Sequence, residues 1–534
     1  MTENSKLHSQ RGVYVNPGPD RFIESIKSDI YVDKTGLIGY TNSVLETKQK
    51  YVCFSRPRRF GKTMAAEMLA AYYDRFADSL NIFDNYAISN VKGYKEHCNI
   101  YDVVFINVQD FLSVSNKNVA TMIEKLTTDI VAEIKELYPD INYYNFKSLS
   151  RVMEDVYRTT NRKFVVIIDE WDCIFRVIRD DNEAQENYLD FLREWLKDKS
   201  YIALVYMTGI LPIKKYGTHS ALNMFDEFSM ENPGRLAEYV GFTEDEVKNL
   251  CLDKNISFDV CKEWYNGYHF KECQAVYNPK SVVAAVRNGE FSDYWNKTEN
   301  YEALKIYIDM NYDGLKDKIL SMMANDSCKI NTGSFKNDMT SFSNSDDILT
   351  LLIHLGYLAY NNTDNIARIP NKEIMQEFIT ATTNSNWNEV IKSVGKSKNL
   401  LEATLNQNDE LVAKYIEDAH LETSHLQYND ENALSYTISL AYYYARNDYD
   451  IKRELPAGKG FADLVFIPKP TSPNHIPMII ELKWDKTADT AIKQIKDKNY
   501  PEVFNSYKGE VLLVGINYDK NTRKHDCITE YFEL

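Results

Sequence analysis

The sequence predicts an α/β protein with two separate sheets, one in its N-terminal half and a smaller one at its C-terminus. Before residue 210, short runs of β-branched and aromatic residues alternate with helical stretches. This is the pattern of βαβ units and a parallel sheet. Residues 233–428 show mainly helical patterns with one expected hairpin. After residue 429, two apolar segments that carry charged residues predict strands of a second α/β domain.

The composition indicates a large chain with several cores and no membrane span. The 534 residues are 44% hydrophobic, which is enough to bury more than one core. No apolar run reaches the length of about 18 residues that a membrane helix needs, and the polar N-terminus lacks the apolar stretch of a signal peptide. The eight cysteines form no CxxC pair, which favours a reducing compartment and argues against structural zinc. We therefore expect a cytoplasmic protein.

The first strand is expected at residues 51–54, before a loop that ends in Gly-Lys-Thr and a helical stretch. This order is the context of a phosphate-binding loop. Backbone N–H groups there point at the phosphates, the lysine adds a positive charge, and the threonine hydroxyl can bind Mg²⁺. Arg56 holds the position of the first glycine of the general pattern GxxxxGK[ST]. The loop residues expected to contact ATP are Arg58, Arg59, Phe60, Gly61, Lys62 and Thr63.

The acidic half of the same site is expected at residues 164–170, FVVIIDE. Five apolar, mostly β-branched residues predict a strand buried on both faces, and ligands bind at the carboxyl ends of such strands. Asp169 is then expected to hold Mg²⁺, together with Thr63, and Glu170 to polarise the attacking water. An apolar core strand ending in an acidic turn is the alternative, and the loop upstream argues against it.

Two further strands, at residues 103–108 and 201–207, complete the predicted parallel sheet. Thr208 directly follows the second of them and can sense the γ-phosphate. An ordinary strand-to-loop turn at Thr208 is the alternative.

A second set of polar residues lies on two apolar segments near the C-terminus. Asp463 is followed by Glu481 and Lys483, which are two residues apart and therefore share one face of a strand with Ile479. Two carboxylates can bind Mg²⁺ or Mn²⁺ through oxygen, and the lysine can orient a water and stabilise a phosphorane. An edge strand with a solvated Glu/Lys face is the alternative.

Five motifs occur in order: YVDKT (31–35), RPRRFGKT (56–63), IIDEWD (167–172), WYNGYHF (264–270) and VYNPKSV (276–282). With them the chain resembles the bacterial AAA-ATPase-like proteins that carry a PD-(D/E)XK nuclease-like domain at the C-terminus. Arg56 in place of the first glycine is normal for that family. Trp171 stands where the family usually has Tyr, and Asn266 stands where Asp is common.

The resemblance implies a P-loop ATPase with a helical lid, a winged-helix-like middle region and a restriction-endonuclease-like α/β domain. It implies that Asp463, Glu481 and Lys483 form the nuclease core. Glu431 would be an additional metal ligand, and Gln494 would support the core from the following helix. The expected division is 1–232 for the ATPase domain, 233–300 for the lid, 301–385 for the winged-helix-like region, 386–428 for a helical connector and 429–534 for the nuclease-like domain.

The resulting hypothesis is an ATP- and Mg²⁺-dependent ATPase coupled to a metal-dependent nuclease whose expected substrate is DNA. The net charge of −16 argues against an overall basic nucleic-acid binder, but residues 430–534 carry only −2 of it. Lysines in this segment either follow a phosphate backbone or form a solvated helix face. The oligomeric state stays open, since related ATPases act as rings, dimers or monomers. One alternative is a nucleotide-switched binding or signalling protein with an inactive nuclease-like domain. The other is a nucleotide-binding clamp without turnover.

Overall fold

The computed structural model describes residues 11–213, 222–295, 302–310, 312, 314–323, 326–337, 339–383, 388–422, 431–470, 472, 475–504, 507 and 509–534. The chain divides into two compact units. The first comprises Met1–Thr298 with Lys329–Glu373, and the second comprises Glu299–Cys328 with Ile374–Leu534.

A five-stranded parallel sheet of order β2-β3-β4-β1-β5 forms the centre of the first unit. Its strands are β1 Tyr51–Ser55, β2 Asp102–Asn107, β3 Phe164–Asp169, β4 Ile202–Gly209 and β5 Asp226–Phe228. Every residue of β1, β3 and β4 is buried, as expected for strands covered on both faces. The four strands predicted from apolar runs are therefore confirmed, whereas β5 was not expected.

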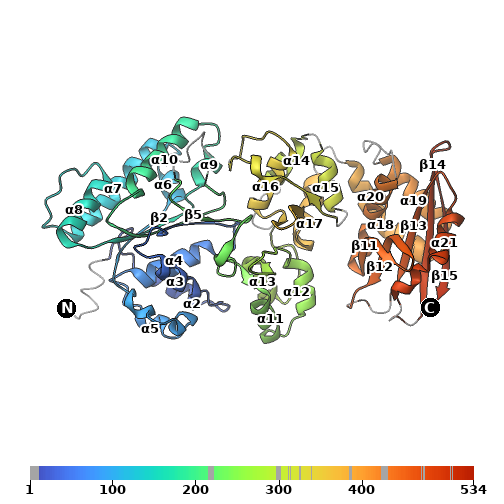
Figure 1. Ribbon diagram of the computed structural model, residues 1–534, viewed down its shortest axis with the longest axis horizontal. Helices are drawn as coiled ribbons and strands as arrows, with labels where there is room; N and C mark the ends of the chain where they lie inside the picture. Colours follow the sequence, from blue (N-terminus) through green and yellow to red (C-terminus); the bar gives the residue numbers. More distant parts are fainter. Residues whose placement is uncertain are drawn as a thin grey trace. The chain divides into compact units, whose positions relative to one another are not determined.

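Helices cover both faces of this sheet, with α3 and α4 on one side and α7, α8 and α10 on the other (Figure 1). Several of these helices begin at a residue whose side chain caps the N-terminus of the helix. Asn118, Ser148 and Asp181 each accept a hydrogen bond from the first turn of α7, α8 and α10. The helix bounds are α2 Asp20–Ile26, α3 Gly36–Val44, α4 Lys62–Tyr73, α5 Leu80–Phe83, α6 Val108–Val114, α7 Val119–Leu137, α8 Leu149–Thr160, α9 Cys173–Val177 and α10 Asn182–Leu196.

A small helical module follows the sheet. It contains α11 Glu244–Asp253, α12 Phe258–Tyr265 and α13 Pro279–Asn288, with the short antiparallel pair β6 Phe242–Thr243 and β7 Val276–Tyr277. Thr243 and Glu246 form a complete capping box at the start of α11, whose first turn is acidic. These elements pack around their own apolar core, which includes Val247, Tyr265 and Val282.

A helix, a hairpin and a second helix follow, as the winged-helix-like pattern predicts. They are α16 Ser345–Leu355, the antiparallel strands β9 Ala359–Asn361 and β10 Ile366–Arg368, and α17 Lys372–Thr383. The short strand β8 Cys328–Lys329 precedes them. Glu373 in α17 is 1% exposed and accepts hydrogen bonds from the backbone N–H groups of Tyr294 and Trp295, at 2.9 and 3.0 Å. Burial raises the pKa of Glu373 to about 8.

We expect the substitution Glu373→Gln to change stability in a pH-dependent way. The raised pKa means that the folded protein favours the neutral carboxyl, whose contribution is present below the ordinary value of 4.5 and is lost as pH rises to about 8. The free energy of unfolding of the wild type relative to the variant should therefore fall by about 1 kcal/mol per pH unit in this window. Thermal unfolding of both proteins across the window measures this difference. The exposed Glu290→Gln serves as control, and a pH-independent difference for Glu373→Gln would contradict the argument.

The second unit is built on a mixed sheet of order β11-β12-β13-β14-β15, in which only β13 and β14 are parallel. One face packs against helices α18, α19 and α20 through residues such as Leu400, Val412 and Ile480. The other face packs against α21 through Ile479, Ile492 and other apolar residues. Glu481 and Lys483 lie on the same face as Ile479, as predicted from their spacing.

The bounds in the second unit are α14 Glu302–Asp309, α15 Leu315–Met323, α18 Asn388–Leu405, α19 Asp409–Glu422, α20 Glu431–Ala441, β11 Tyr449–Ala457, β12 Gly460–Pro468, β13 Met478–Trp484, α21 Ala488–Asp497, β14 Glu510–Asp519 and β15 Lys524–Glu533. Within the described residues, no helix has both the length and the apolar character that a bilayer span requires.

Candidate functional sites

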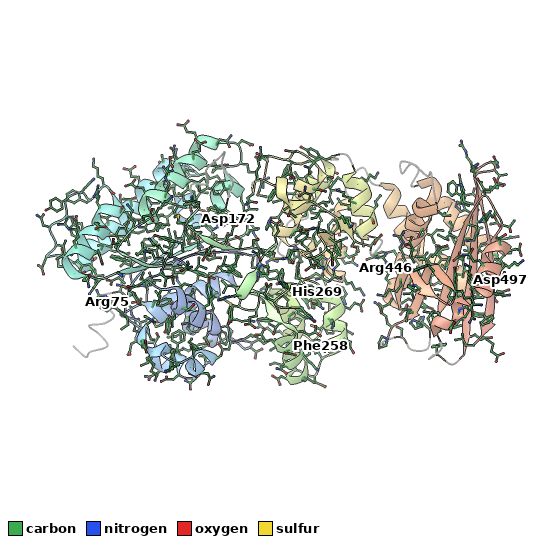
Figure 2. All side chains as sticks on the ribbon, in the orientation of Figure 1. Arg75, Asp172, Phe258, His269, Arg446 and Asp497 are labelled. Atoms are coloured by element: carbon green, nitrogen blue, oxygen red, sulfur yellow. The ribbon has the colours of Figure 1, made fainter. Side chains whose placement is uncertain are left out.

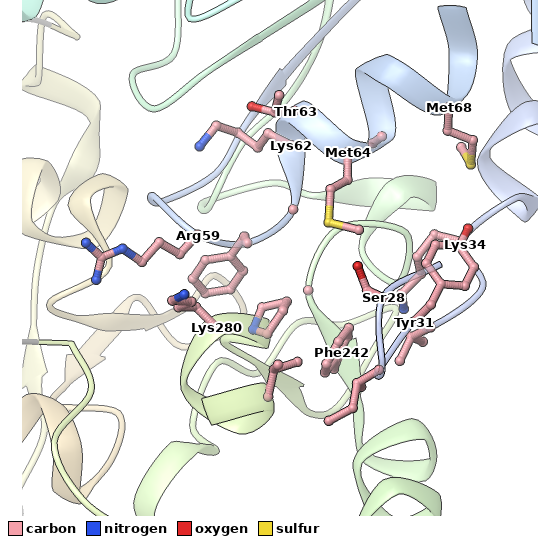
Figure 3. A pocket seen from close by; sticks show the side chains of 18 of the residues that line it. Ser28, Tyr31, Lys34, Arg59, Lys62, Thr63, Met64, Met68, Phe242 and Lys280 are labelled. Atoms are coloured by element: carbon pink, nitrogen blue, oxygen red, sulfur yellow. The ribbon is translucent and has the colours of Figure 1, made fainter. Parts of the chain in front are cut away.

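A cavity of about 640 Å³ opens at the phosphate loop in the first unit. Figure 3 shows Lys62 and Thr63 at the start of α4, with Tyr31 and Phe242 beyond the labelled Met64. Six cationic side chains line the cavity against two carboxylates, so it favours an anionic ligand. The cations are Lys34, Arg58, Arg59, Lys62, Lys280 and Arg287, and the carboxylates are Asp29 and Glu170.

The phosphate loop lines this cavity and enters helix α4 at a glycine. Gly61 caps α4 with a left-handed φ of +93°, which a residue with a side chain adopts at a cost. The Lys62 side chain is buried, and its Nζ donates to the carbonyl oxygen of Pro57 at 3.0 Å. Burial lowers the pKa of Lys62, although the nearby charges of Glu170 and Asp169 oppose this effect. Lys62 is thus a desolvated cation held inside its own loop.

Thr63 and Asp169 meet across the strand ends. The Thr63 hydroxyl donates to Asp169 Oδ2 at 2.7 Å. Burial raises the pKa of Asp169 to about 6, although the hydrogen bond from Thr63 opposes this. A hydroxyl and a carboxylate oxygen in contact at the mouth of a cation-lined cavity are suitable ligands for a nucleotide-bound Mg²⁺, directly or through water. The residues present therefore fit the expected ion.

Glu170 and Thr208 lie at the ends of two adjacent strands. Glu170 lines the cavity and has a left-handed φ of +52°, a strained conformation for a residue with a side chain. Thr208 Oγ1 is buried and has no hydrogen-bond partner among the described residues. A buried hydroxyl without a partner is costly, so a ligand that engages Thr208 would remove that cost.

The remaining predicted loop residues differ in their surroundings. Arg58 is exposed and lines the cavity. Arg59 has a left-handed φ of +67° and donates from Nη1 to the carbonyl oxygen of Trp295 at 3.3 Å. Phe60 is buried, and its ring lies 5.4 Å from the ring of Tyr268, measured between centroids. Phe60 therefore joins the loop to the WYNGYHF motif in addition to lining the cavity.

Arg56, at the position of the first glycine, is a packed internal residue. It is fully buried, and its guanidinium carbon lies 4.6 Å from the centroid of the Phe54 ring and 5.0 Å from that of Phe270. Its Nη1 donates to the carbonyl oxygen of Ser229 at 2.9 Å. Burial lowers the pKa of Arg56 to about 9. The side chain thus fills space between the strand, the edge strand β5 and the helical module.

We expect Arg56→Gly, which restores the general loop pattern, to destabilise the first unit by about 3 kcal/mol or more. It empties the space between two aromatic rings and leaves a buried carbonyl without its donor. Arg56→Met keeps an unbranched stem there and should cost much less, because it also removes the desolvated charge. Thermal unfolding of the two variants measures the difference. If Arg56→Gly unfolds at the same temperature as the wild type, the packing of Arg56 between the two rings does not contribute to stability.

The apolar part of the cavity was missed from the sequence. Ile30, Tyr31 and Val32 line it together with Phe242 and Val283. The one sequence feature that pointed to this wall was the pair of motifs YVDKT and VYNPKSV, which both contribute residues to it. In the first of these, Lys34 donates to both carboxylate oxygens of Glu246 at 2.7 and 2.6 Å and to the carbonyl oxygen of Glu238 at 2.7 Å. Lys34 therefore ties this wall of the cavity to helix α11.

The second site brings together Asp463, Glu481, Lys483 and Gln494. Asp463 Oδ2 accepts a hydrogen bond from the backbone N–H of Leu482 at 2.7 Å. Lys483 Nζ donates to Glu481 Oε1 at 2.8 Å, and Gln494 Nε2 donates to the same oxygen. Gln494 also donates to the Tyr500 hydroxyl at 3.1 Å, a contact not anticipated from the sequence.

Glu481 has the properties of a cation ligand. Its Oε2 is buried and has no hydrogen-bond partner among the described residues. Burial and the charge of Asp463 raise the pKa of Glu481, and Lys483 opposes them. The described residues contain no group of three or more His, Cys, Asp or Glu placed to hold a metal ion. Glu431 begins α20, and its side chain lies outside the described part of the structure. Two carboxylates beside a lysine fit Mg²⁺ or Mn²⁺ with water completing the coordination.

These features define the class of each part. The phosphate loop, the acidic strand end and the parallel sheet give the first unit a P-loop ATPase fold. The mixed sheet with Asp463 and Glu481-x-Lys483 gives the C-terminal segment a restriction-endonuclease-like α/β fold. Two family models agree: residues 20–218 match the predicted AAA-ATPase family, and residues 431–527 match the PD-(D/E)XK nuclease superfamily. The chain therefore combines these two domains, which confirms the architecture inferred from its motifs.

The chain is 22% identical to an uncharacterized protein in the vnfD 5' region of Azotobacter chroococcum mcd 1, over 92% of this chain and 93% of that protein. Among solved structures it is similar to the ORC2 protein of Aeropyrum pernix in its ADPNP–ADP complexes, with a TM-score of 0.29, 12% identity, and coverage of 67% of this chain and 98% of that one. For the ORC1 protein of Aeropyrum pernix in complex with DNA, the TM-score is 0.26, the identity 10%, and the coverage 70% and 98%. Structural similarities with TM-scores this low do not indicate a shared function.

Proposed function

We propose that the first unit binds and hydrolyses ATP in the 640 Å³ cavity. The observation that carries this is the 2.7 Å contact between Thr63 Oγ1 and Asp169 Oδ2 at the phosphate loop. Lys62 and the N-terminus of α4 hold the β- and γ-phosphates, and Glu170 accepts a proton from the attacking water. Thr208 contacts the γ-phosphate. Mg²⁺, when bound by Thr63 and Asp169, neutralises phosphate charge.

The remaining wall of the cavity supports a nucleotide rather than free phosphate. Apolar side chains from the YVDKT segment and the helical module face the loop across Met64, and a purine base fits such a surface. Lys280 and Arg287 add positive charge from α13, beside the phosphate region, while Arg58 and Arg59 add it from the loop.

We further propose that the C-terminal domain is a metal-dependent nuclease acting on phosphodiesters, with DNA as the expected substrate. The buried Glu481 Oε2 without a partner supports a cation there. Asp463 and Glu481, with Glu431, hold the ion, Lys483 orients the attacking water, and Gln494 holds Glu481 in place. The ion, when bound, polarises the phosphoryl oxygen. An ATPase domain at 1–232 and a lid at 233–300 would control this nuclease in the cytoplasm, where eight free cysteines are stable.

The experiment that tests both activities is cleavage of a DNA and RNA panel with Mg²⁺ or Mn²⁺, with and without ATP. Phosphate release is followed in the same reactions. Wild type is compared with Lys483→Ala. Cleavage that disappears in this variant and in chelator supports the nuclease, and a change in cleavage on adding ATP supports coupling. Phosphate release without cleavage under any condition would favour the alternative, a nucleotide-switched protein with an inactive nuclease-like domain.

A further inference from the structure

Among the described residues, the carboxylate of Glu170 is held through one of its two oxygens. Its Oε2 accepts a hydrogen bond from Arg176 Nη2, and the two groups form an ion pair in which Arg176 is 6% exposed. Glu170 lines the cavity, and among the described residues no hydrogen bond is made to its second oxygen, Oε1. A carboxylate that must accept a proton from water needs this arrangement, with one oxygen fixed and the other free.

Arg176 is itself fixed from behind. Its Nε donates to Asp172 Oδ2 at 3.1 Å, and the Asp172 side chain is completely buried (labelled in Figure 2). The same Asp172 oxygen accepts the backbone N–H groups of Ile210 at 3.1 Å and Leu211 at 2.8 Å. Burial lowers the pKa of Arg176, but the charges of Asp172 and Glu170 outweigh this and raise it above its ordinary value. The guanidinium therefore stays charged.

These contacts form a continuous connection between two strand ends. Ile210 and Leu211 directly follow β4, the strand that carries Thr208 near its end. Glu170 directly follows β3. The Asp172–Arg176 ion pair joins these two strand ends, beside a backbone hydrogen bond from Trp171 N–H to the carbonyl oxygen of Thr208 at 3.1 Å. A shift of the β4 end would therefore be transmitted to the Glu170 carboxylate through the hydrogen bonds of Asp172 and Arg176.

We propose that Arg176 is a positioning residue for ATP hydrolysis, which holds Glu170 for water activation and links it through Asp172 to the end of the Thr208 strand. This role rests on the proposed ATPase function. Arg176 does not line the cavity, so it acts through Glu170 and not on the nucleotide. A role confined to folding would instead affect stability and nucleotide binding without a separate effect on turnover.

The test compares the turnover and nucleotide affinity of Arg176→Gln, Arg176→Lys, Glu170→Gln and the double variant Glu170→Gln/Arg176→Gln. Affinity is measured with a non-hydrolysable ATP analogue. We expect Arg176→Gln to lower kcat by about 10-fold to 100-fold with little change in affinity, and Arg176→Lys to recover part of the loss. The double variant should be no slower than Glu170→Gln alone, because both changes act on one unit. Arg179→Gln is the matched control, since within the described residues the Arg179 side chain donates to the backbone oxygen of Arg176 and to no other group.

The outcomes separate this role from the activity on which it rests. Wild-type kcat in Arg176→Gln, with Glu170→Gln inactive, would overturn the positioning role while leaving ATP hydrolysis intact. A loss in Arg176→Gln that adds fully to that of Glu170→Gln would also overturn it. If Arg176→Gln does not fold, equal kcat in Arg176→Lys and Glu170→Gln would overturn it, because the retained charge would then have no effect. Wild-type binding of ATP without turnover would refute the proposed hydrolysis and this role with it.

Discussion

Lys62→Ala is expected to lower ATP turnover by about 100-fold to 1,000-fold and to weaken nucleotide binding. The Lys62 ammonium is buried, and its one hydrogen bond to the part of the chain that the structure describes goes to the carbonyl oxygen of Pro57 in its own loop. Burial lowers the pKa of this group, which means that the protein holds the charge at an energetic cost. Phosphate oxygens would offset that cost, and the interaction is strong because water is largely excluded.

The measurements are steady-state phosphate release and the affinity for a non-hydrolysable ATP analogue. Lys125→Ala is the matched control, since Lys125 also donates to a single backbone oxygen, that of Val114, but does not line the cavity. Thermal unfolding should change little in Lys62→Ala, because the substitution removes a desolvated charge together with its contact. Wild-type turnover in Lys62→Ala would show that the phosphates bind elsewhere. It would contradict the proposal that this loop binds the phosphates of ATP.

The sheet of the first unit was predictable because its central strands are continuous apolar runs. β3 and β4 are buried on both faces, and this burial is visible in the sequence as unbroken apolar runs. β5, Asp226–Phe228, escaped prediction because it is three residues long and its acidic first residue is exposed. It is a strand only because its backbone pairs with β1, and no local pattern encodes such pairing.

The candidate sites show the same division between local and tertiary information. The phosphate loop, Asp169 and Glu170 follow from local motifs whose chemistry is specific. The apolar wall combines Tyr31, Phe242 and Val283, which are far apart in the chain and meet only after folding. In the sequence Arg56 stands out only as a missing glycine, but in the structure it is an internal cation packed against two aromatic rings. Arg176 has no motif of its own, and its contact with Glu170 depends on the short helix α9.

Glu481→Gln is expected to abolish metal-dependent cleavage, with a loss of about 1,000-fold, since a metal ligand supplies several kcal/mol of transition-state stabilisation. Glutamine keeps the acceptor for Lys483 and Gln494 at Oε1 but replaces the buried oxygen that has no partner with an NH₂ group. This group cannot bind a cation. The affinity for Mn²⁺ should therefore fall at least about 10-fold.

The pH dependence provides a second test of the same residue. Burial and the charge of Asp463 raise the pKa of Glu481 to about 7, so below this value a proton competes with the ion. Mn²⁺ affinity in the wild type should rise with pH by up to about 10-fold per unit until the carboxyl is ionised. The folding stability of the wild type without the ion has the opposite pH dependence. The stability contributed by the neutral carboxyl of Glu481 is lost as pH rises through about 7. Glu481→Gln should lack both effects.

The matched control is Glu454→Gln, since Glu454 is an exposed carboxylate on strand β11 of the same sheet, and this variant should cleave and bind Mn²⁺ like the wild type. Folding of Glu481→Gln should be preserved at about pH 8, because the neutral side chain avoids the cost of burying an ionised carboxylate. Cleavage by a well-folded Glu481→Gln at the wild-type rate would refute the metal-ligand role. Wild-type protein that binds Mn²⁺ at Glu481 but cleaves no nucleic acid would instead leave a metal site without nuclease chemistry, which favours the nucleotide-switched alternative.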